Sequence, residues 1–338
     1  MKKIFTLFLL FLMLFGISSC FSTNESDGGL GSGSTIVEVS SFRVYFVIDG
    51  KARSYKEVNN MQIFTPPSIP KKTNYTVVGW VNEQGILHDF TKPLKQETTL
   101  YAKYDIDYKT LVNLVSTTMM SSHVQIEVTI YNMGGFLGLT KKNVSSKSGS
   151  GIIFHDQHDN YYVITNAHVT SNESRKHIDI KVKDYKGRSY TAYKHENAEQ
   201  DGFDLSVIYF KKPKEMLQVV DIAHKNPLLN QAVISLGQPQ GQNNTITFGI
   251  IKKYEIITLS SGVSLPFEVI NHSAPTDSGS SGGAILDLEL NLVGVHFAGS
   301  KDYEGNFKSG YAIPAETIQH YLKNYVWIKQ TFTAVILK

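Results

Sequence analysis

The sequence predicts a mainly β protein divided into two parts. Short runs rich in β-branched and aromatic residues, separated by polar turns, recur through most of the chain. A length of 338 residues favours two domains over one, and 41% hydrophobic residues supply enough apolar mass for a core. The formal net charge of +3 gives no basic surface of the kind that nucleic acid requires, so no nucleic-acid partner is expected.

The first 40 residues read as targeting and tethering segments. Two lysines, an apolar run over residues 4–16 and small residues after it are typical of a secretory signal, predicted here as residues 1–19. Cys20 is the only cysteine, and residues 17–20 (ISSC) resemble the bacterial lipoprotein box. The resemblance implies a lipid on Cys20 that holds the protein on the extracytoplasmic face of the cell membrane. An ordinary signal peptide with a chance cysteine is the alternative.

Residues 20–40 follow as lipid anchor and tether. The stretch FSTNESDGGLGSGS (21–34) is polar and rich in glycine and serine, a composition typical of a flexible linker. We therefore expect the folded part of the chain to begin near residue 41.

Residues 41–106 are predicted to form a small β module. The runs 42–48, 76–80 and 98–104 have strand composition, and PPSIP (66–70) is a rigid extended link. This order of strand, proline link, Gly-Trp, Asp-Phe and TTLYAK resembles the internalin-type B repeat, also called the Listeria–Bacteroides repeat. The resemblance implies a β-grasp-like module of a bacterial surface protein, which either binds a surface ligand or acts as a spacer.

Residues 107–338 are predicted to form the second domain. A helix is expected over 109–120, with Leu111, Leu114, Val115, Thr118 and Met119 facing the core, and a closing helix over 316–325. Between them the chain is strongly β, which indicates a barrel or a sandwich. The expected strands are 124–130, 151–154, 161–165, 178–182, 205–210, 232–236, 245–251 and 292–297.

Three motifs in this domain carry chemistry when they are taken together. His168 follows an apolar strand in YYVITNAHV, Asp204 precedes another in FDLSVIYF, and Ser281 lies in the glycine frame GSSGGAI. This succession resembles the trypsin-like serine peptidases, most closely their HtrA/Deg and glutamyl-endopeptidase branches. The resemblance covers residues 123–325 and implies a two-barrel, chymotrypsin-type fold. A flexible linker is the alternative explanation of the glycine frame alone.

The expected roles follow from the chemistry of each side chain. A serine hydroxyl such as that of Ser281 is too weakly acidic to attack a peptide alone, and His168 can accept its proton and return it to the leaving amine. Asp204 can accept a hydrogen bond from the other ring nitrogen and so fix the tautomer of His168. By resemblance, the backbone amides of Gly279 and Ser281 form the oxyanion hole. Ser280 stands where digestive peptidases carry aspartate, so their activation route is absent.

The same resemblance indicates the residues that choose the substrate. Glutamyl endopeptidases carry threonine and histidine at the positions of Thr276 and His296, where they line the primary specificity pocket. Pro275 stands where enzymes that cleave after Lys or Arg hold an aspartate. A hydroxyl donor together with a protonated imidazole would suit a carboxylate, so cleavage after Glu is expected. Cleavage after a small or medium apolar residue is the alternative.

The sequence analysis therefore predicts a membrane-anchored, extracytoplasmic serine endopeptidase that acts on polypeptides and requires no cofactor. The alternative is a surface adhesin in which the peptidase domain is an inactive scaffold. The run HDQHD (155–159) has residue types that bind metals, but its place between two strands favours a solvated hairpin turn, so no metal site is expected.

Overall fold

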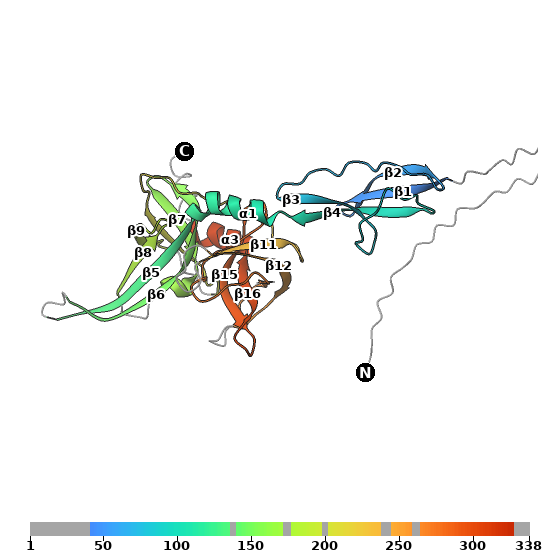
Figure 1. Cartoon of the computed structure of the whole chain (residues 1–338). Coiled ribbons are helices and arrows are strands. Elements are labelled where there is room, and N and C mark those ends of the chain that lie inside the picture. Colours follow the sequence, from blue (N-terminus) through green and yellow to red (C-terminus); the bar gives the residue numbers. More distant parts are fainter. Residues whose placement is uncertain are drawn as a thin grey trace, which may run out of the picture.

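A computed structural model gives the structure of the chain (Figure 1). It describes residues 41–135, 140–171, 177–197, 202–237, 245–258 and 264–327. The expected signal peptide, Cys20 and the tether lie outside the described residues, as does most of the C-terminal segment 326–338. In the part that is described, none of the helices is long and apolar enough to cross a membrane.

The N-terminal part is a four-stranded sheet with the strand order β2-β1-β4-β3. We call it the N-terminal sheet. Its strands are β1 (Ser41–Ile48), β2 (Lys51–Asn59), β3 (Tyr75–Val81) and β4 (Thr98–Ile106). The core of the sheet is small and aromatic: the ring centroids of Phe46 and Trp80 lie 4.8 Å apart, and both side chains are buried.

A helical segment joins the N-terminal sheet to the rest of the chain. Only Asp107 separates β4 from α1 (Tyr108–Leu114), and its carboxylate accepts a hydrogen bond from the backbone N–H of Thr110 as an N-cap. The helix continues as a π-turn, η1 (Val115–Met119), and a 3-10 turn, η2 (Met120–Ser122). Thr118, expected to face the core, is exposed, because the wider π-turn rotates it outward.

The remaining strands form two closed six-stranded barrels, each antiparallel throughout. The first barrel has the order β10-β7-β6-β5-β8-β9 and the second the order β11-β12-β13-β16-β15-β14. Of the two architectures that the strand pattern allowed, a barrel or a sandwich, the chain adopts the barrel. The prediction of a mainly β fold with two barrels and an N-terminal sheet is confirmed.

The strands of the first barrel are β5 (His123–Gly134), β6 (Thr140–Gln157), β7 (Asn160–Thr165), β8 (His177–Lys183), β9 (Ser189–Lys194) and β10 (Ser206–Lys211). A one-turn helix, α2 (Ala167–Thr170), follows β7. The run 155–159 lies in the β6–β7 hairpin, but only His158 and Asp159 form the turn, because residues 155–157 still pair with β7. The outer parts of β5 and β6 project well beyond the barrel as a two-stranded arm, at the left of Figure 1.

The strands of the second barrel are β11 (Ala232–Gly237), β12 (Thr245–Glu255), β13 (Val269–His272), β14 (Ala284–Leu286), β15 (Leu292–Lys301) and β16 (Phe307–Pro314). The chain then forms α3 (Ala315–Tyr321) and the π-turn η5 (Leu322–Val326), which pack their apolar residues into the largest hydrophobic core. That core also takes in Leu111 and Val115 of the joining helix, so the helix is part of the two-barrel unit.

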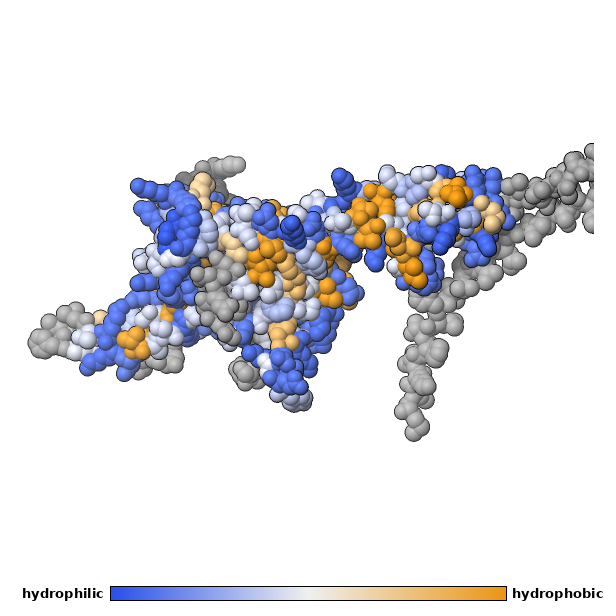
Figure 2. Space-filling model, in the orientation of Figure 1, coloured by the Kyte–Doolittle hydropathy of each residue, from blue (hydrophilic) through white to orange (hydrophobic). Residues whose placement is uncertain are grey.

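The N-terminal sheet contacts the second barrel directly. The side-chain amide of Asn74, directly before β3, donates a hydrogen bond of 2.6 Å to the carbonyl oxygen of Leu288, and Tyr75 of β3 and Ile106 of β4 pack against the largest hydrophobic core. Figure 2 shows that apolar side chains gather in patches on the N-terminal sheet and near this junction, whereas the projecting arm is mostly hydrophilic.

Candidate active site

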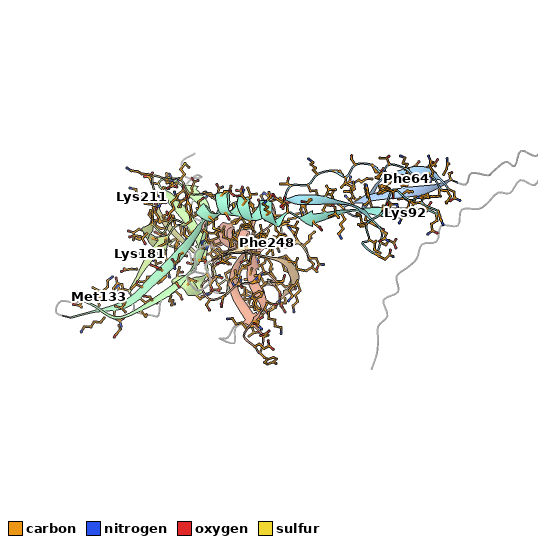
Figure 3. The ribbon with its side chains drawn as sticks, in the orientation of Figure 1. Phe64, Lys92, Met133, Lys181, Lys211 and Phe248 are labelled. Carbon is orange, nitrogen blue, oxygen red and sulfur yellow. The ribbon has the colours of Figure 1, made fainter. Side chains whose placement is uncertain are left out.

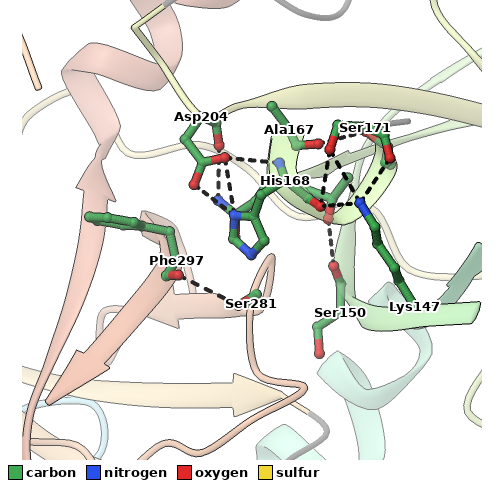
Figure 4. Close-up of polar contacts among 11 residues, drawn as sticks. Lys147, Ser150, Ala167, His168, Ser171, Asp204, Ser281 and Phe297 are labelled. Carbon is green, nitrogen blue, oxygen red and sulfur yellow. Dashed lines mark hydrogen bonds and ion pairs between the residues drawn. The ribbon is translucent and has the colours of Figure 1, made fainter. Parts of the chain in front are cut away.

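His168 and Asp204 meet because two neighbouring strands of the first barrel bring them to the same edge. Strand β7 ends at Thr165, which is opposite Ser206 at the start of β10. His168 on α2 and Asp204 just before β10 therefore lie at one end of this antiparallel pair. Nδ1 of His168 is 2.9 Å from Oδ2 of Asp204 and 3.1 Å from Oδ1 (Figure 4). The backbone N–H of His168 also donates to Oδ1, at 3.0 Å.

The surroundings of the two side chains suit a proton relay to a substrate. The side chain of His168 is 49% exposed, whereas that of Asp204 is 14% exposed. The carboxylate is therefore shielded while the imidazole remains accessible. A carboxylate on Nδ1 fixes the ring in the tautomer whose Nε2 is free to accept a proton.

The backbone of Asp204 is held in an unusual conformation. Its φ is +48°, a left-handed value that is uncommon for a residue with a Cβ atom. The side-chain amide of Asn166 donates to the carbonyl oxygen of Asp204 at 3.0 Å. The preceding Phe203 packs against Phe267 and Tyr325, with ring centroids 5.7 and 5.4 Å away. These contacts on both sides hold the carboxylate in place against the cost of the strained φ.

The glycine frame around Ser281 is a tight turn of the second barrel, not a linker. Gly279 and Gly282 have φ values of +94° and +85°. A Cβ atom on Gly282 would lie 2.0 Å from the carbonyl oxygen of Ser150 and 2.3 Å from the hydroxyl of Thr165, so no side chain fits there. The turn between β13 and β14 thus packs against the first barrel and presents Ser281 at the junction of the barrels.

Ser281 lies near His168, but the two are not hydrogen-bonded. The hydroxyl of Ser281 makes a long contact of 3.5 Å with the carbonyl oxygen of Phe297, and no hydrogen bond among the described residues joins it to the imidazole (Figure 4). Long contacts of this kind are common in peptidases without substrate, where the bond between nucleophile and base tightens only in the reacting complex.

The two backbone amides expected to form an oxyanion hole are positioned from across the barrel junction. The hydroxyl of Ser150 donates to the carbonyl oxygen of Gly279 at 2.8 Å, and the N–H of Ser150 donates to that of Ser281 at 2.7 Å. Within the part of the chain that is described, neither the N–H of Gly279 nor that of Ser281 has a hydrogen-bond acceptor. Both donors are therefore available to a developing negative charge.

A cavity of about 200 Å³ opens beside Ser281. Thr276 and His296 both line it. The hydroxyl of Thr276 is buried and has no partner among the described residues, so it can bond to a group that enters the cavity. Asp277 and Lys301 also line the cavity, and their charged groups lie 3.1 Å apart.

His296 differs from the sequence-based expectation in its charge. Burial, followed by the nearby His272 and His168, lowers the pKa of His296 well below the ordinary value of 6.5. Nδ1 of His296 lies 3.3 Å from Nε2 of His272, whose own pKa is lowered to about 4 by burial. At neutral pH His296 is therefore uncharged, and the only cation that lines the cavity within the described residues is Lys301.

Three residues that bear on the site escaped the sequence analysis. Ser150 holds the backbone of Gly279, Phe203 anchors Asp204, and Lys301 lies in the cavity wall. Phe203 is the first residue of the quoted motif FDLSVIYF and carried a signal, because a bulky aromatic residue directly before a catalytic acid suggests an anchor. Ser150 and Lys301 act through contacts between distant segments, which the sequence pattern does not contain.

Comparison with known proteins agrees with this geometry. Residues 149–295 match the family model of the trypsin-like peptidase domain. The chain is 30% identical over 173 residues to the periplasmic serine endoprotease DegP of Escherichia coli strain K12, a match that covers 51% of this chain and 34% of that protein. It is 28% identical over 188 residues to the serine protease Do-like HtrA of Bacillus subtilis strain 168, covering 53% and 39% respectively.

A further relative is a probable DegP-like periplasmic serine endoprotease of Buchnera aphidicola subsp. Baizongia pistaciae, 27% identical over 207 residues, which covers 59% of this chain and 41% of that one. A solved structure of an HtrA-type protease with a tripeptide has a TM-score of 0.48 and 22% identity, covering 63% of this chain and 62% of that one. The chain spans about a third to two fifths of the length of these curated relatives.

The matched segment, which contains His168, Asp204 and Ser281, is thus a trypsin-like serine peptidase domain. More particularly, the domain is that of a serine endopeptidase of the HtrA/DegP type.

Proposed function

We propose that the whole chain is a membrane-anchored, extracytoplasmic serine endopeptidase in which His168, Asp204 and Ser281 act as a catalytic triad. The observation that carries the proposal is the 2.9 Å contact between His168 and Asp204 beside a serine that faces a cavity. In the first step the hydroxyl oxygen of Ser281 attacks the scissile carbonyl while Nε2 of His168 takes its proton. Asp204 stabilises the resulting imidazolium.

The amides of Gly279 and Ser281 stabilise the tetrahedral intermediate. Collapse of that intermediate breaks the peptide bond, and His168 gives its proton to the leaving amine. Water then attacks the acyl-enzyme by the same route and releases the new carboxylate. Loss of one oxyanion donor typically costs about 3–4 kcal/mol in the transition state. The hydrogen bond from Ser150 that positions the backbone of Gly279 should therefore affect turnover.

A fluorophosphonate probe tests this assignment. The probe should label the purified wild-type protein and fail to label Ser281→Ala, while Ser278→Ala, in the same turn, should label normally. Labelling of Ser281→Ala at the wild-type rate would reject the assignment. Absence of labelling in both proteins would favour the inactive scaffold and the adhesin function.

We also propose that the enzyme cleaves after Glu. The unpartnered hydroxyl of Thr276, a neutral His296 and the ammonium of Lys301 all line the cavity and can each donate to a carboxylate. The ion pair with Asp277 must open before Lys301 can bind substrate, so the preference over Gln should be moderate. The measurement is kcat/KM for matched peptides with Glu or Gln before the scissile bond. A ratio of one would reject charge recognition.

The variants Lys301→Ala and His296→Ala divide this preference between charge and shape. Lys301→Ala should reduce the ratio of Glu to Gln cleavage, because it removes the one cation that lines the cavity among the described residues. His296→Ala should lower kcat/KM for both peptides, because a neutral imidazole does not distinguish a charged carboxylate from an amide by Coulomb attraction.

For the segments outside the described residues we propose lipidation at Cys20, supported by the ISSC box after an apolar run. We further propose that the N-terminal sheet is an internalin-type B repeat with a β-grasp-like fold. Labelling of growing cells with a palmitate analogue tests the first proposal. Wild type and Cys20→Ala that label equally would reject it.

A further inference from the structure

A second cavity, of about 470 Å³, opens beside α3 and shares no described lining residue with the cavity beside Ser281. Glu316, Thr317 and His320 of α3 line one side of it, and we call it the α3 cavity. Its volume lies in the range of roughly 300–1,000 Å³ that is usual for sites of small ligands. The catalytic steps described above make no use of it.

The α3 cavity lies away from the junction with the N-terminal sheet. Figure 3 shows Phe248 of β12 close to the joining helix, where its ring lies 4.9 Å from that of Tyr108. Tyr254, which lines the cavity, is near the opposite end of the same strand. Within the described residues no part of the N-terminal sheet lines the cavity, so the sheet does not close it.

Aromatic rings form much of the wall of the α3 cavity. Phe203, Tyr254 and Phe267 all line it. The ring of Phe203 is stacked with that of Phe267, at a centroid distance of 5.7 Å, and with that of His320, at 6.1 Å. The hydroxyl of Tyr254 donates a hydrogen bond of 2.6 Å to the carbonyl oxygen of Pro227, which fixes the third ring. Aromatic faces of this kind attract cations.

The charged side chains that line the α3 cavity are both acidic. Glu268 and Glu316 are exposed, and neither has a basic partner in the described part of the chain. The side-chain amide of Asn226 donates to Glu316 at 3.0 Å and holds that carboxylate in place. His320 adds no positive charge: the amide nitrogen of Asn324, which can only donate, lies 2.9 Å from its Nδ1, so Nδ1 is unprotonated.

This combination of groups favours one chemical class of ligand. Burial, followed by the charge of Glu316, raises the pKa of Tyr254 to about 12, so the phenol stays neutral. The two carboxylates would repel an anion, and an apolar ligand would take water from them without replacing its hydrogen bonds. A cation that carries apolar surface suits both the carboxylates and the rings, and alkylammonium and guanidinium groups have this chemistry.

Phe203 joins the α3 cavity to the candidate active site. It lines the cavity and directly precedes Asp204, whose backbone is held at a φ of +48°. A ligand against Phe203 limits the motion of its ring, and a strained backbone persists only where the surrounding contacts hold it. Occupation of the α3 cavity should therefore act on the position of the Asp204 carboxylate and not on the cavity that takes the substrate.

We propose that the α3 cavity binds an organic cation with an alkylammonium or guanidinium group, and that its occupation raises turnover by steadying Asp204 through Phe203. The binding itself does not depend on the proposed function. The effect on turnover rests on that function, because it assumes that Asp204 acts in catalysis.

N-butylguanidinium and N-butylurea test the binding, because they differ by one charge and very little in shape. In NMR titrations of the purified protein the cation should bind at least about tenfold more tightly than the urea, and added salt should weaken its binding. Equal binding of the two compounds, or no binding of the cation, would overturn the proposal.

The variants Glu268→Gln and Glu316→Gln locate the site, with Asp277→Asn as the matched control. Each Gln variant should weaken binding of N-butylguanidinium about threefold, and the double variant about tenfold, with an unchanged thermal midpoint to show that they are folded. Asp277 is the acidic residue that lines the cavity beside Ser281 among the described residues, so Asp277→Asn should keep the affinity. Loss of binding in Asp277→Asn alone would place the cation beside Ser281 and reject the α3 cavity.

A peptide with one arginine, and the same peptide with citrulline in its place, separate the two sources of such a cation. Both are titrated into Ser281→Ala, which should not cleave them. Tighter binding of the arginine peptide than of N-butylguanidinium would identify a basic side chain of a polypeptide as the ligand, and weaker binding a free organic cation. Equal binding of the arginine and citrulline peptides would contradict recognition of the charge.

Turnover of a short peptide tests the connection to Asp204. Saturating N-butylguanidinium should raise kcat about two- to threefold with KM unchanged, and it should have no effect in the Glu268→Gln/Glu316→Gln double variant. If the cation binds but kcat stays constant, the connection through Phe203 is rejected. A rise in KM alone would mean that the cation competes with substrate, which overturns the proposal. If no peptide is cleaved at all, the proposed function fails, while the titrations still decide whether the site exists.

Discussion

The two barrels have the same number of strands and contribute complementary parts of the site, yet they place their ionisable groups differently. The first barrel supplies His168 and Asp204 and pairs the buried carboxylate of Asp184 with Arg188. The second supplies Ser281 and the cavity and buries His272 beside His296. The same barrel architecture therefore holds ionisable groups that titrate in two different pH ranges.

In the first barrel a network of opposite charges ties the loop after β8 to the segment before the second barrel. Burial acts to raise the pKa of Asp184, but hydrogen bonds from Arg188 and Tyr190 outweigh it and hold this pKa below its ordinary value. Hydrogen bonds from Lys186, Arg188 and Tyr185 lower the pKa of Glu215 to about 2. Both carboxylates thus stay ionised to low pH.

In the second barrel His272 and His296 lie side by side, and the positive charge of Lys252 acts together with burial to lower the pKa of His272. His272 is packed so closely that a Cβ atom on Gly310 would lie 2.2 Å from its ring. The neutral form of both rings is favoured by burial, which is the opposite of the stabilised charges in the first barrel.

The largest effect should come from breaking the contribution of either barrel to the triad. Ser281→Ala or His168→Ala should each reduce kcat by about 10⁴- to 10⁶-fold, and the double variant should lose little more, because the groups act as a unit. The measurement is kcat for cleavage of a peptide substrate by each variant, from assays stopped at timed intervals. Independent losses that multiply in the double variant would contradict joint action of the two barrels.

The second prediction concerns the different responses of the two barrels to pH. The folded-state pKa of His272 is about 4, whereas an unfolded histidine has a pKa of about 6.5, so the unfolded chain binds more protons between these values. The contribution of His272 to the free energy of unfolding is therefore complete above about pH 6.5, and about 3 kcal/mol of it is lost as the pH drops toward 4.

Hydrogen exchange at pH 7.5 and 4.5, corrected for intrinsic rates, should show this loss in β13 and β15 and less of it in β7 and β10. The variant His272→Gln should reduce the pH dependence, since it removes the titrating group. Uniform loss of protection in both barrels would show that the histidines do not set the acid response of the second.

A smaller effect should follow from loosening the contact between the barrels. Ser150→Ala removes the hydroxyl that bonds to the carbonyl oxygen of Gly279, and we expect kcat to fall about tenfold with KM nearly unchanged, because the oxyanion donors act in the transition state. Ser150→Thr, which keeps a hydroxyl, is the control. A change confined to KM would place the role of Ser150 in substrate binding.

The smallest effect should come from the surface network of the first barrel. Glu215→Gln removes an exposed carboxylate whose ion pairs are screened by solvent, so the thermal midpoint at pH 7 should change little. Asp184→Asn should lower it more, because the side chain of Asp184 is fully buried. Equal effects of the two changes would show that burial does not decide the strength of this network.

The sequence predicted those strands that combine apolar character with β-branched residues, such as 232–236 and 292–297. It did not predict β2, because KARSYKEVN is exposed and polar, or β14, because three residues are too short for a recognisable pattern. The helix over 109–120 was predicted in place, but its π-turn was not, since such turns leave no distinct mark in residue type.

Within the site, too, the sequence predicted some features and not others. The order of the three motifs predicted that His168 and Asp204 lie close together. They do so because the pairing of β7 with β10 places the two adjoining loops side by side. The neutral state of His296 could not be predicted from the sequence, because it depends on how completely other segments bury the ring. The contact of Ser150 with Gly279 likewise joins segments far apart in the sequence.

The order of strands in the N-terminal sheet determines how the sheet resists a pulling force. Strands β1 and β4 are parallel neighbours, paired from Val44 opposite Thr98 to Val47 opposite Tyr101. The chain enters this pair at the start of β1 and leaves it at the end of β4, which lie at opposite ends of the sheet. Tension between the N-terminus and the barrels therefore loads these hydrogen bonds in shear, so they must break together, whereas a hairpin pulled from one end opens one bond at a time. With the proposed lipid anchor on Cys20, drag on the barrels would be carried through these paired strands.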